Sequence, residues 1–293
     1  YTNSTGSNNT GIGRGSLTGN TTASDNTAVG YQSLASNTTG TRGVAVGALA
    51  LGANTTGNDN VAVGGGTSGV SFAALASNTT GAKNTAIGNS ALGANTTANN
   101  NTAVGYAALL DNTTGANNTA IGYAALDANT TANNNSALGY SALGSNTTGS
   151  NNVSMGQGSS GANTTGSNNT AIGTEALNNN TTASDNTAIG FESLKANSTG
   201  VDNVAVGSEA LESNTTASHN TAVGYRSLQQ NTTGAYNSGF GKYALQNNTT
   251  ASNNTAVGNS ALGVNTTGYD NVAVGRNSLD ANTTGYTNVA VGE

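Results

Sequence analysis

The sequence contains no cysteine, no proline and no tryptophan, and it has a single histidine. The absence of cysteine excludes disulfides and thiolate-ligated metal sites, but it does not fix the compartment. Charged residues make up only 7% of the 293 residues, against about 25% in an ordinary globular domain. A net charge of −6 over this length gives no basic patch, so binding of nucleic acid or of an anionic membrane is not expected.

Long apolar runs are also missing. No stretch approaches the ~20 apolar residues of a transmembrane helix, and no signal peptide is visible at Tyr1, so we expect no membrane insertion in this chain. Asn, Thr, Gly, Ala and Ser dominate instead. Such polar chains are often disordered, but disorder usually comes with high net charge or abundant proline, and neither is present.

A repeat of 17 residues organises the chain. The motif "NTAVG" and its variants end in a glycine at positions such as Gly13, Gly30 and Gly47, and the series runs to Gly292. One interval is longer, because the seven residues 65–71, "GGTSGVS", interrupt the period. We therefore predict one continuous repeat array over residues 1–293 with an insert at 65–71, which is either a recognition loop or a tolerated surface bulge.

Each position of the repeat has its own residue type. The residue before the glycine is always apolar, as at Val29, and with the insert set aside the fourth residue after it is leucine except at Ser160. Alternation in the "TAVG" segment has the period of a strand, and 17 residues are too few for a helical-hairpin repeat. We predict an all-β, parallel β-solenoid (β-roll) of about 17 coils: a strand through "TAVG", a shorter strand through "xAL" and a turn through "NTTG".

Charged residues avoid the strand, leucine and Asn-Thr-Thr positions. We therefore expect valines such as Val29 and leucines such as Leu34 to fill a thin core. One coil orders 17 residues at about 1–2 kcal/mol each and buries too little to fold alone, so stability must come from stacking. At ~4.8 Å per coil the array predicts a rod of ~80 Å. Both ends keep the repeat pattern, so we expect the array to continue or to stack on a neighbour.

The strand motif "NTAVG/NVAVG/NTAIG" resembles the "NSVAIG" repeat of trimeric autotransporter adhesin heads. The full unit "GxNNTAIGYxALxxNTTG" is similar to repeat arrays of bacterial surface proteins and phage tail fibres. The resemblance implies a left-handed coil and a homotrimer. The adhesin-head coil is shorter than the repeat of this chain, and no membrane anchor, coiled-coil stalk or chaperone domain is recognisable in the sequence.

The Asn-Thr-Thr column has two interpretations. Every copy is an N-x-T sequon, which predicts N-glycosylation, whereas identical amides at one position also predict a hydrogen-bonded ladder along the axis. The middle residue is always Thr or Ser, which favours the structural interpretation. The asparagines of this column are Asn3, Asn20, Asn37, Asn54, Asn78, Asn95, Asn112, Asn129, Asn146, Asn163, Asn180, Asn197, Asn214, Asn231, Asn248, Asn265 and Asn282.

Tyrosines follow the strand glycine on three consecutive coils, at Tyr106, Tyr123 and Tyr140. They form either a stacking platform for sugars or a ladder of rings packed on one another. Acids such as Asp59 lie in turns similar to calcium-binding turns, but the required repeat is missing, so no metal site is expected. The adjacent threonines of Asn-Thr-Thr supply at most one outward column, which does not favour ice binding.

No constellation for catalysis is recognisable. His219 stands alone on a turn, and no nucleophile elbow, phosphate loop or paired-carboxylate pattern occurs outside the repeat. We expect no enzyme activity and no cofactor. The sequence predicts a structural rod or fibre on a cell or virion surface that self-associates, by end-to-end stacking or as a homotrimer. The alternative is an adhesin head or tail-fibre module that recognises host glycans or proteins.

Overall fold

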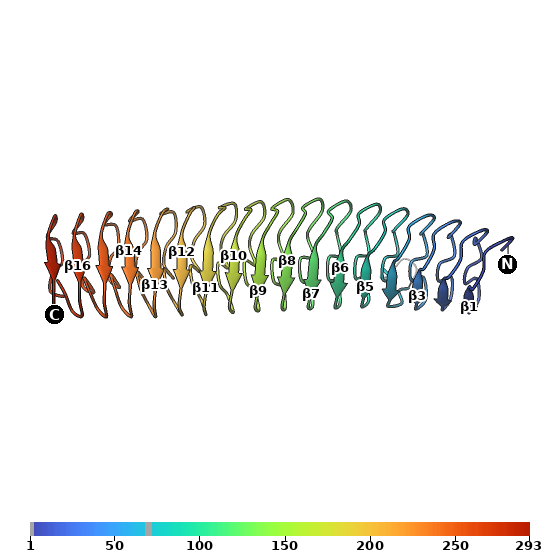
Figure 1. Ribbon diagram of the computed structural model, residues 1–293, viewed down its shortest axis with the longest axis horizontal. Coiled ribbons are helices and arrows are strands. Elements are labelled where there is room, and N and C mark those ends of the chain that lie inside the picture. The colour runs from blue at the N-terminus through green and yellow to red at the C-terminus, as the bar shows by residue number, and fades with distance from the viewer. Residues whose placement is uncertain (1–2, 68–71) are drawn as a thin grey trace. The chain divides into compact units, whose positions relative to one another are not determined.

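The protein is an all-β parallel solenoid with one short strand per coil (Figure 1). A computed structural model describes residues 3–67 and 72–293, and these residues contain no helix. This confirms the predicted fold class. The chain divides into two compact units, residues 1–150 and residues 151–293.

The first unit contains eight parallel strands of three residues, each paired in register with the next. Thr85 of one strand lies opposite Thr102 of the following strand, and Ala86 lies opposite Ala103. Identical repeat positions therefore form columns. The strands are β1 (Thr10–Ile12), β2 (Thr27–Val29), β3 (Val44–Val46), β4 (Val61–Val63), β5 (Thr85–Ile87), β6 (Thr102–Val104), β7 (Thr119–Ile121) and β8 (Ser136–Leu138).

The second unit repeats the arrangement with nine strands. Its register is the same, with Thr170 opposite Thr187 and Ala171 opposite Ala188. The strands are β9 (Val153–Met155), β10 (Thr170–Ile172), β11 (Thr187–Ile189), β12 (Val204–Val206), β13 (Thr221–Val223), β14 (Ser238–Phe240), β15 (Thr255–Val257), β16 (Val272–Val274) and β17 (Val289–Val291).

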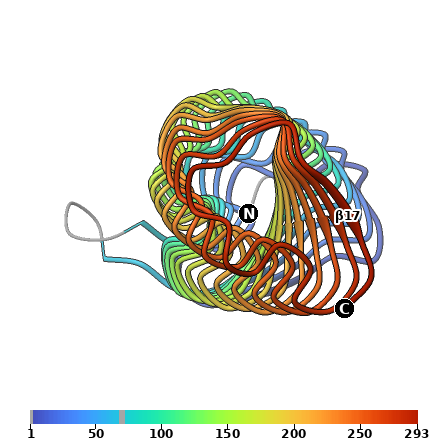
Figure 2. The ribbon, with the colours of Figure 1, turned by 90° about the vertical axis from the view of Figure 1, so that its left-hand side faces the viewer.

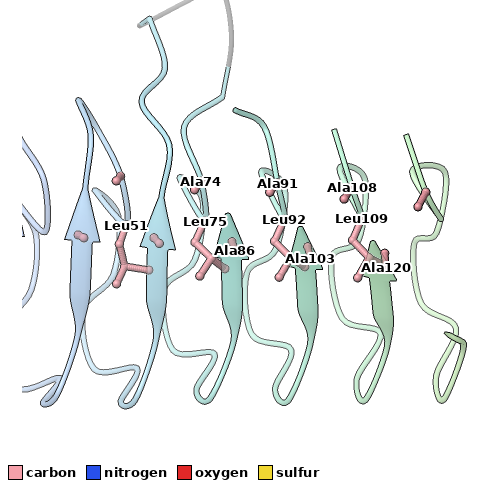
Figure 3. Close-up of a cluster of buried hydrophobic side chains, with 14 of the residues drawn as sticks. Leu51, Ala74, Leu75, Ala86, Ala91, Leu92, Ala103, Ala108, Leu109 and Ala120 are labelled. Carbon is pink, nitrogen blue, oxygen red and sulfur yellow. The ribbon is translucent and has the colours of Figure 1, made fainter. Parts of the chain in front are cut away.

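Alanine and leucine form the core. The middle residue of each strand, such as Ala86 and Ala103, points inward, and the leucine of the following turn packs against it (Figure 3). Leu92 and Leu109 are completely buried, so the leucine prediction is confirmed. The valine prediction is wrong: the first and third strand residues point outward, and Val46 remains 37% exposed. Side chains of a strand alternate between its two sides, so the pattern allows either the middle residue or the first and third residues to point inward. In this protein the middle residue, usually alanine, points inward.

The predicted second strand through "xAL" is also wrong. Its leucines have a positive φ, for example 48° at Leu34 and 50° at Leu92, so the backbone lies in the left-handed region instead of being extended. A leucine in this region is strained. Its complete burial between alanines of neighbouring coils offsets that strain.

Two structural features, a positive φ and a close contact between coils, require glycine after the strand. Gly30 has a φ of 139°, and a Cβ placed on it would lie 2.5 Å from the carbonyl oxygen of Gly47 in the next coil. Neighbouring coils therefore approach too closely at this corner for any side chain. The same corner recurs in both units, which explains the constancy of this glycine in the repeat.

The insert leaves the sheet undisturbed. Gly66 still donates its N–H to Ala48 of the preceding coil, and the carbonyl of Phe72 already accepts from Ser90 of the following coil. Figure 2 shows the chain departing from the outline of the coils at this point. Residues 68–71 of the predicted insert lie outside the described residues. Strands β4 and β5 on either side keep their register, with Val61 opposite Thr85.

Candidate functional surfaces

One outward surface carries no charge and has an apolar residue on every strand. We call the first and third residues of the strands the sheet face, and none of these residues is charged. The third position is always a large apolar residue, and Ile121 is 39% and Leu138 46% exposed in the first unit. Ile172 and Ile189 show the same partial exposure in the second unit. A contiguous row of partly exposed apolar side chains makes the sheet face a candidate interaction surface.

The sequon asparagines form buried ladders. Asn112 donates one N–H to the side-chain oxygen of Asn95 at 3.1 Å and another to the carbonyl of Gly115 at 2.9 Å. Its own side-chain oxygen accepts from Asn129 at 2.8 Å. The same pattern links the column within each unit, from Asn20 to Asn146 and from Asn180 to Asn282. The structure therefore contains the coil-to-coil hydrogen bonds that the ladder interpretation predicts.

This geometry bears on glycosylation. An N-linked glycan replaces one of the two amide hydrogens, and in Asn112 both are already bound inside the protein. The residue is completely buried, as are its equivalents Asn95 and Asn129. A glycan on this nitrogen is therefore incompatible with the ladder. Glycosylation of the column stays a prediction that a mass measurement tests.

A second ladder was missed by the sequence analysis. The asparagine just before the strand, such as Asn101, receives the backbone N–H of Asn118 on its side-chain oxygen at 2.9 Å. Its amide nitrogen donates across the coil to the carbonyl of Gly115 at 2.8 Å. The asparagine at this position, replaced only by Gly43, was the available signal. Together the two ladders satisfy buried backbone groups in coils too narrow for a large apolar core.

The tyrosines of the predicted ladder stack on one another. The ring centroids of Tyr106 and Tyr123 are 5.2 Å apart, and those of Tyr123 and Tyr140 are 5.3 Å apart. The rings are about half exposed and nearly parallel. Both faces of Tyr123 are therefore covered by its neighbours, which leaves its edge for contact. A sugar stacks on a ring face, so the geometry favours packing at this site.

The remaining candidate residues lie in similar columns. His219 stacks on Tyr236 with centroids 4.9 Å apart, and its ring nitrogen lies 3.7 Å from the Asp202 carboxylate. Lys195 bridges Glu175 and Glu192, and the hydrogen bonds that its ammonium donates to these two carboxylates raise its pKa. Within residues 3–67 and 72–293 no three His, Cys, Asp or Glu side chains are placed to hold a metal ion.

The described part of the chain also has no helix long and apolar enough to cross a membrane. No protein-family model matches the sequence, and none of the curated proteins compared with it is similar enough to count as a match.

Proposed function

We propose that the chain is a structural rod segment of an extracellular or virion-surface fibre, in which copies of the chain associate through the sheet face. The observation that carries the proposal is the uncharged surface along the strands of each unit, with its regularly spaced column of partly exposed apolar residues. The role is mechanical and needs no catalytic step. The resemblance to repeats of bacterial surface proteins and phage tail fibres supports the same location.

The sheet face is large enough for a stable interface. The eight strands of the first unit present two outward side chains each. If every one of these side chains loses roughly 50 Å² of exposed surface, the unit alone contributes about 800 Å², the area per partner of a standard interface. The second unit carries one strand more.

Periodicity selects a second copy of the chain as the partner. The sheet face repeats a small residue (Thr, Ser or Val) and an apolar residue at the spacing of parallel strands. A surface that matches every position must share that spacing, and another copy does so by construction. Uncharged columns also let two copies approach without placing like charges opposite each other.

The asparagine columns have a structural role in this proposal. They bind each coil to the next inside the rod, so the sequons are not glycan acceptors in the folded chain. The measurement is the intact mass of the native material. A mass equal to the sequence mass of 28.4 kDa supports the ladder role, whereas additional hexose-containing mass on this column contradicts it.

Cysteine cross-linking tests the association, because the chain has no cysteine of its own. We expect Ile121→Cys, placed on the sheet face of β7, to form an inter-chain disulfide on mild oxidation at low protein concentration. The matched control is Thr114→Cys, at an exposed turn position. Scanning Ile87, Val104 and Ile121 in turn allows for a shift between copies. Equal cross-linking of the control and all three sheet-face variants would contradict the proposal.

A second candidate function is a binding module that recognises host glycans or proteins. This binding function is favoured by aromatic and cationic side chains that break the uniformity of the repeat. They gather around Tyr225 and Tyr243. A rod can carry both functions, because the two surfaces use different residues.

A further inference from the structure

A groove follows the turns that come after the strands. It is bounded by the second residue after the strand glycine on one side and by the fifth and sixth on the other. In the second unit it opens into a cleft of about 290 Å³. The residues that line it with polar or aromatic groups are Tyr243, Gln246, Asn247, Ser260, Asn277 and Asp280.

The cleft exists because small residues occupy one of its coils. Gly263 stands where the neighbouring coils carry Gln246 and Asp280, so no side chain fills the middle of the groove. A similar opening in the first unit, about 450 Å³ in volume, is lined mainly by apolar or small residues such as Leu49, Ala53 and Phe72. The cleft of the second unit is the one with a polar lining.

The Gln246 side chain of this cleft is held in place from outside. Gln246 donates its amide N–H to the side-chain oxygen of Gln229 at 3.1 Å. Gln229 in turn donates to the carboxylates of Glu209 and Glu212 at 2.8 Å each. This chain of hydrogen bonds orients the Gln246 amide and directs its carbonyl oxygen away from Gln229. Such pre-organised amides reduce the ordering cost of binding a polar ligand.

A cation and a second aromatic ring lie beside Tyr243, which itself lines the cleft. The ammonium of Lys242 lies 4.7 Å from the ring centroid of Tyr243 and 5.9 Å from that of Tyr225. The two rings meet edge to face, 5.5 Å apart. Arg226 also lies over Tyr225, but its guanidinium is bound to Glu209. Lys242 is exposed and has no ion pair among the described residues.

We propose that this cleft binds an acidic oligosaccharide. A sugar ring packs against Tyr243, its hydroxyl groups bond to Gln246, Asn247 and Asn277, and its carboxylate pairs with Lys242. Aromatic rings beside amide and hydroxyl groups are the chemistry of an amphipathic, hydroxyl-rich ligand. Asp280 at the opposite end repels a second carboxylate, which fixes the direction in which the glycan lies.

This inference rests on the second candidate function and gives it a location. It does not depend on the sheet face, whose residues lie on the strands. Failure of glycan binding would leave the association of copies intact, and failure of association would leave the cleft intact. The two are distinguished by measuring the sedimentation of the same samples that are used for binding.

The experiment uses the full chain on immobilised oligosaccharides, with each uronate- or sialate-bearing glycan paired with its neutral counterpart. We expect retention on acidic members only, weakened at least tenfold by Lys242→Met and by raised salt. Lys83→Met is the matched control and should bind like the unmodified chain. Because Lys242 is exposed, its replacement leaves the fold unchanged, as circular dichroism would verify. No retention, equal retention of neutral glycans, or unchanged binding of Lys242→Met would overturn the proposal.

Discussion

Ser154 and Ser160 lie in the same coil, both are buried, and neither hydroxyl has a hydrogen-bond partner. Ser154 replaces the inward alanine of the strand, and Ser160 replaces the core leucine. The apolar core of the first unit ends at Leu143 and that of the second unit begins at Ala171, so this coil belongs to neither. It is therefore the weakest coil of the second unit.

Restoring leucine should strengthen this coil. We expect Ser160→Leu to raise the free energy of unfolding by about 2–3 kcal/mol, because it removes an unsatisfied buried hydroxyl and adds buried apolar surface. Met155 does not compete for the space, since it points outward and is 38% exposed. Thermal unfolding followed by circular dichroism measures the change. A lower midpoint would mean that the coil has no room for the side chain.

A smaller substitution separates the two contributions. Ser154→Ala should raise the unfolding midpoint slightly, because it removes only the unsatisfied hydroxyl. Ser159→Ala is the control, since the hydroxyl of Ser159 donates to the carbonyl of Gly156 at 3.0 Å. That control should lower the midpoint. Shifts of the same sign for both variants would argue against the hydrogen-bond account.

The amide ladder can be tested by one chemical change at two positions of one coil. Asn112→Asp removes both amide donors from a completely buried ladder and places a charge there. We expect a loss of about 2–4 kcal/mol at neutral pH. Asn117→Asp makes the same change at an exposed turn position and should have little effect. Urea unfolding of the two variants compares them, and equal stabilities would refute a stabilising ladder.

The corner glycines should tolerate no side chain. Gly30→Ala combines a positive φ with a Cβ only 2.5 Å from the carbonyl oxygen of Gly47. We expect a loss of at least about 2 kcal/mol, as for other incompatible glycine replacements. At Gly144 the nearest atom would be 3.3 Å away and φ is not positive, so Gly144→Ala should change stability by less than about 1 kcal/mol. Similar unfolding midpoints for both would contradict the close approach of the coils.

One carboxylate should make stability depend on pH. Burial raises the pKa of Asp127, and the nearby Asp111 carboxylate adds to the effect. A raised folded-state pKa means that ionisation is less favourable in the folded chain, so this penalty is absent at low pH and complete above the raised pKa. Asp127→Asn should therefore stabilise the chain by a few tenths of a kcal/mol at pH 7 and not at pH 3.

The exposed acid Asp270 provides the control for that comparison. Asp270→Asn makes the same chemical change at an exposed turn position, so we expect little change at either pH. Thermal unfolding at pH 7 and pH 3 is the measurement. A stabilisation by Asp127→Asn that is equal at both values of pH would show that the charge is not the cause.

Much of the fold followed from the sequence, because a strict period leaves few architectures. The buried position of Leu34 and the alignment of the sequon asparagines could be predicted from their columns. The orientation of Val29 could not, since alternation fixes a period without fixing which phase faces inward. The cluster of Lys242 with Tyr225 and Tyr243 was also missed, because Tyr243 lies one residue beyond the repeat position that Lys242 and Tyr225 share in adjacent coils. Only the stacking of those coils brings the three side chains together.

Sedimentation equilibrium of the unmodified chain tests the central claim most directly, because the sheet face is proposed to be covered by another copy. We expect a mass that is a multiple of 28.4 kDa, and we expect Ile121→Lys combined with Ile189→Lys to reduce it toward that of one chain. Thr114→Lys combined with Thr182→Lys, at exposed turn positions of the two units, should leave the multiple unchanged. A folded, unmodified chain that sediments as a single copy at micromolar concentration would contradict the account.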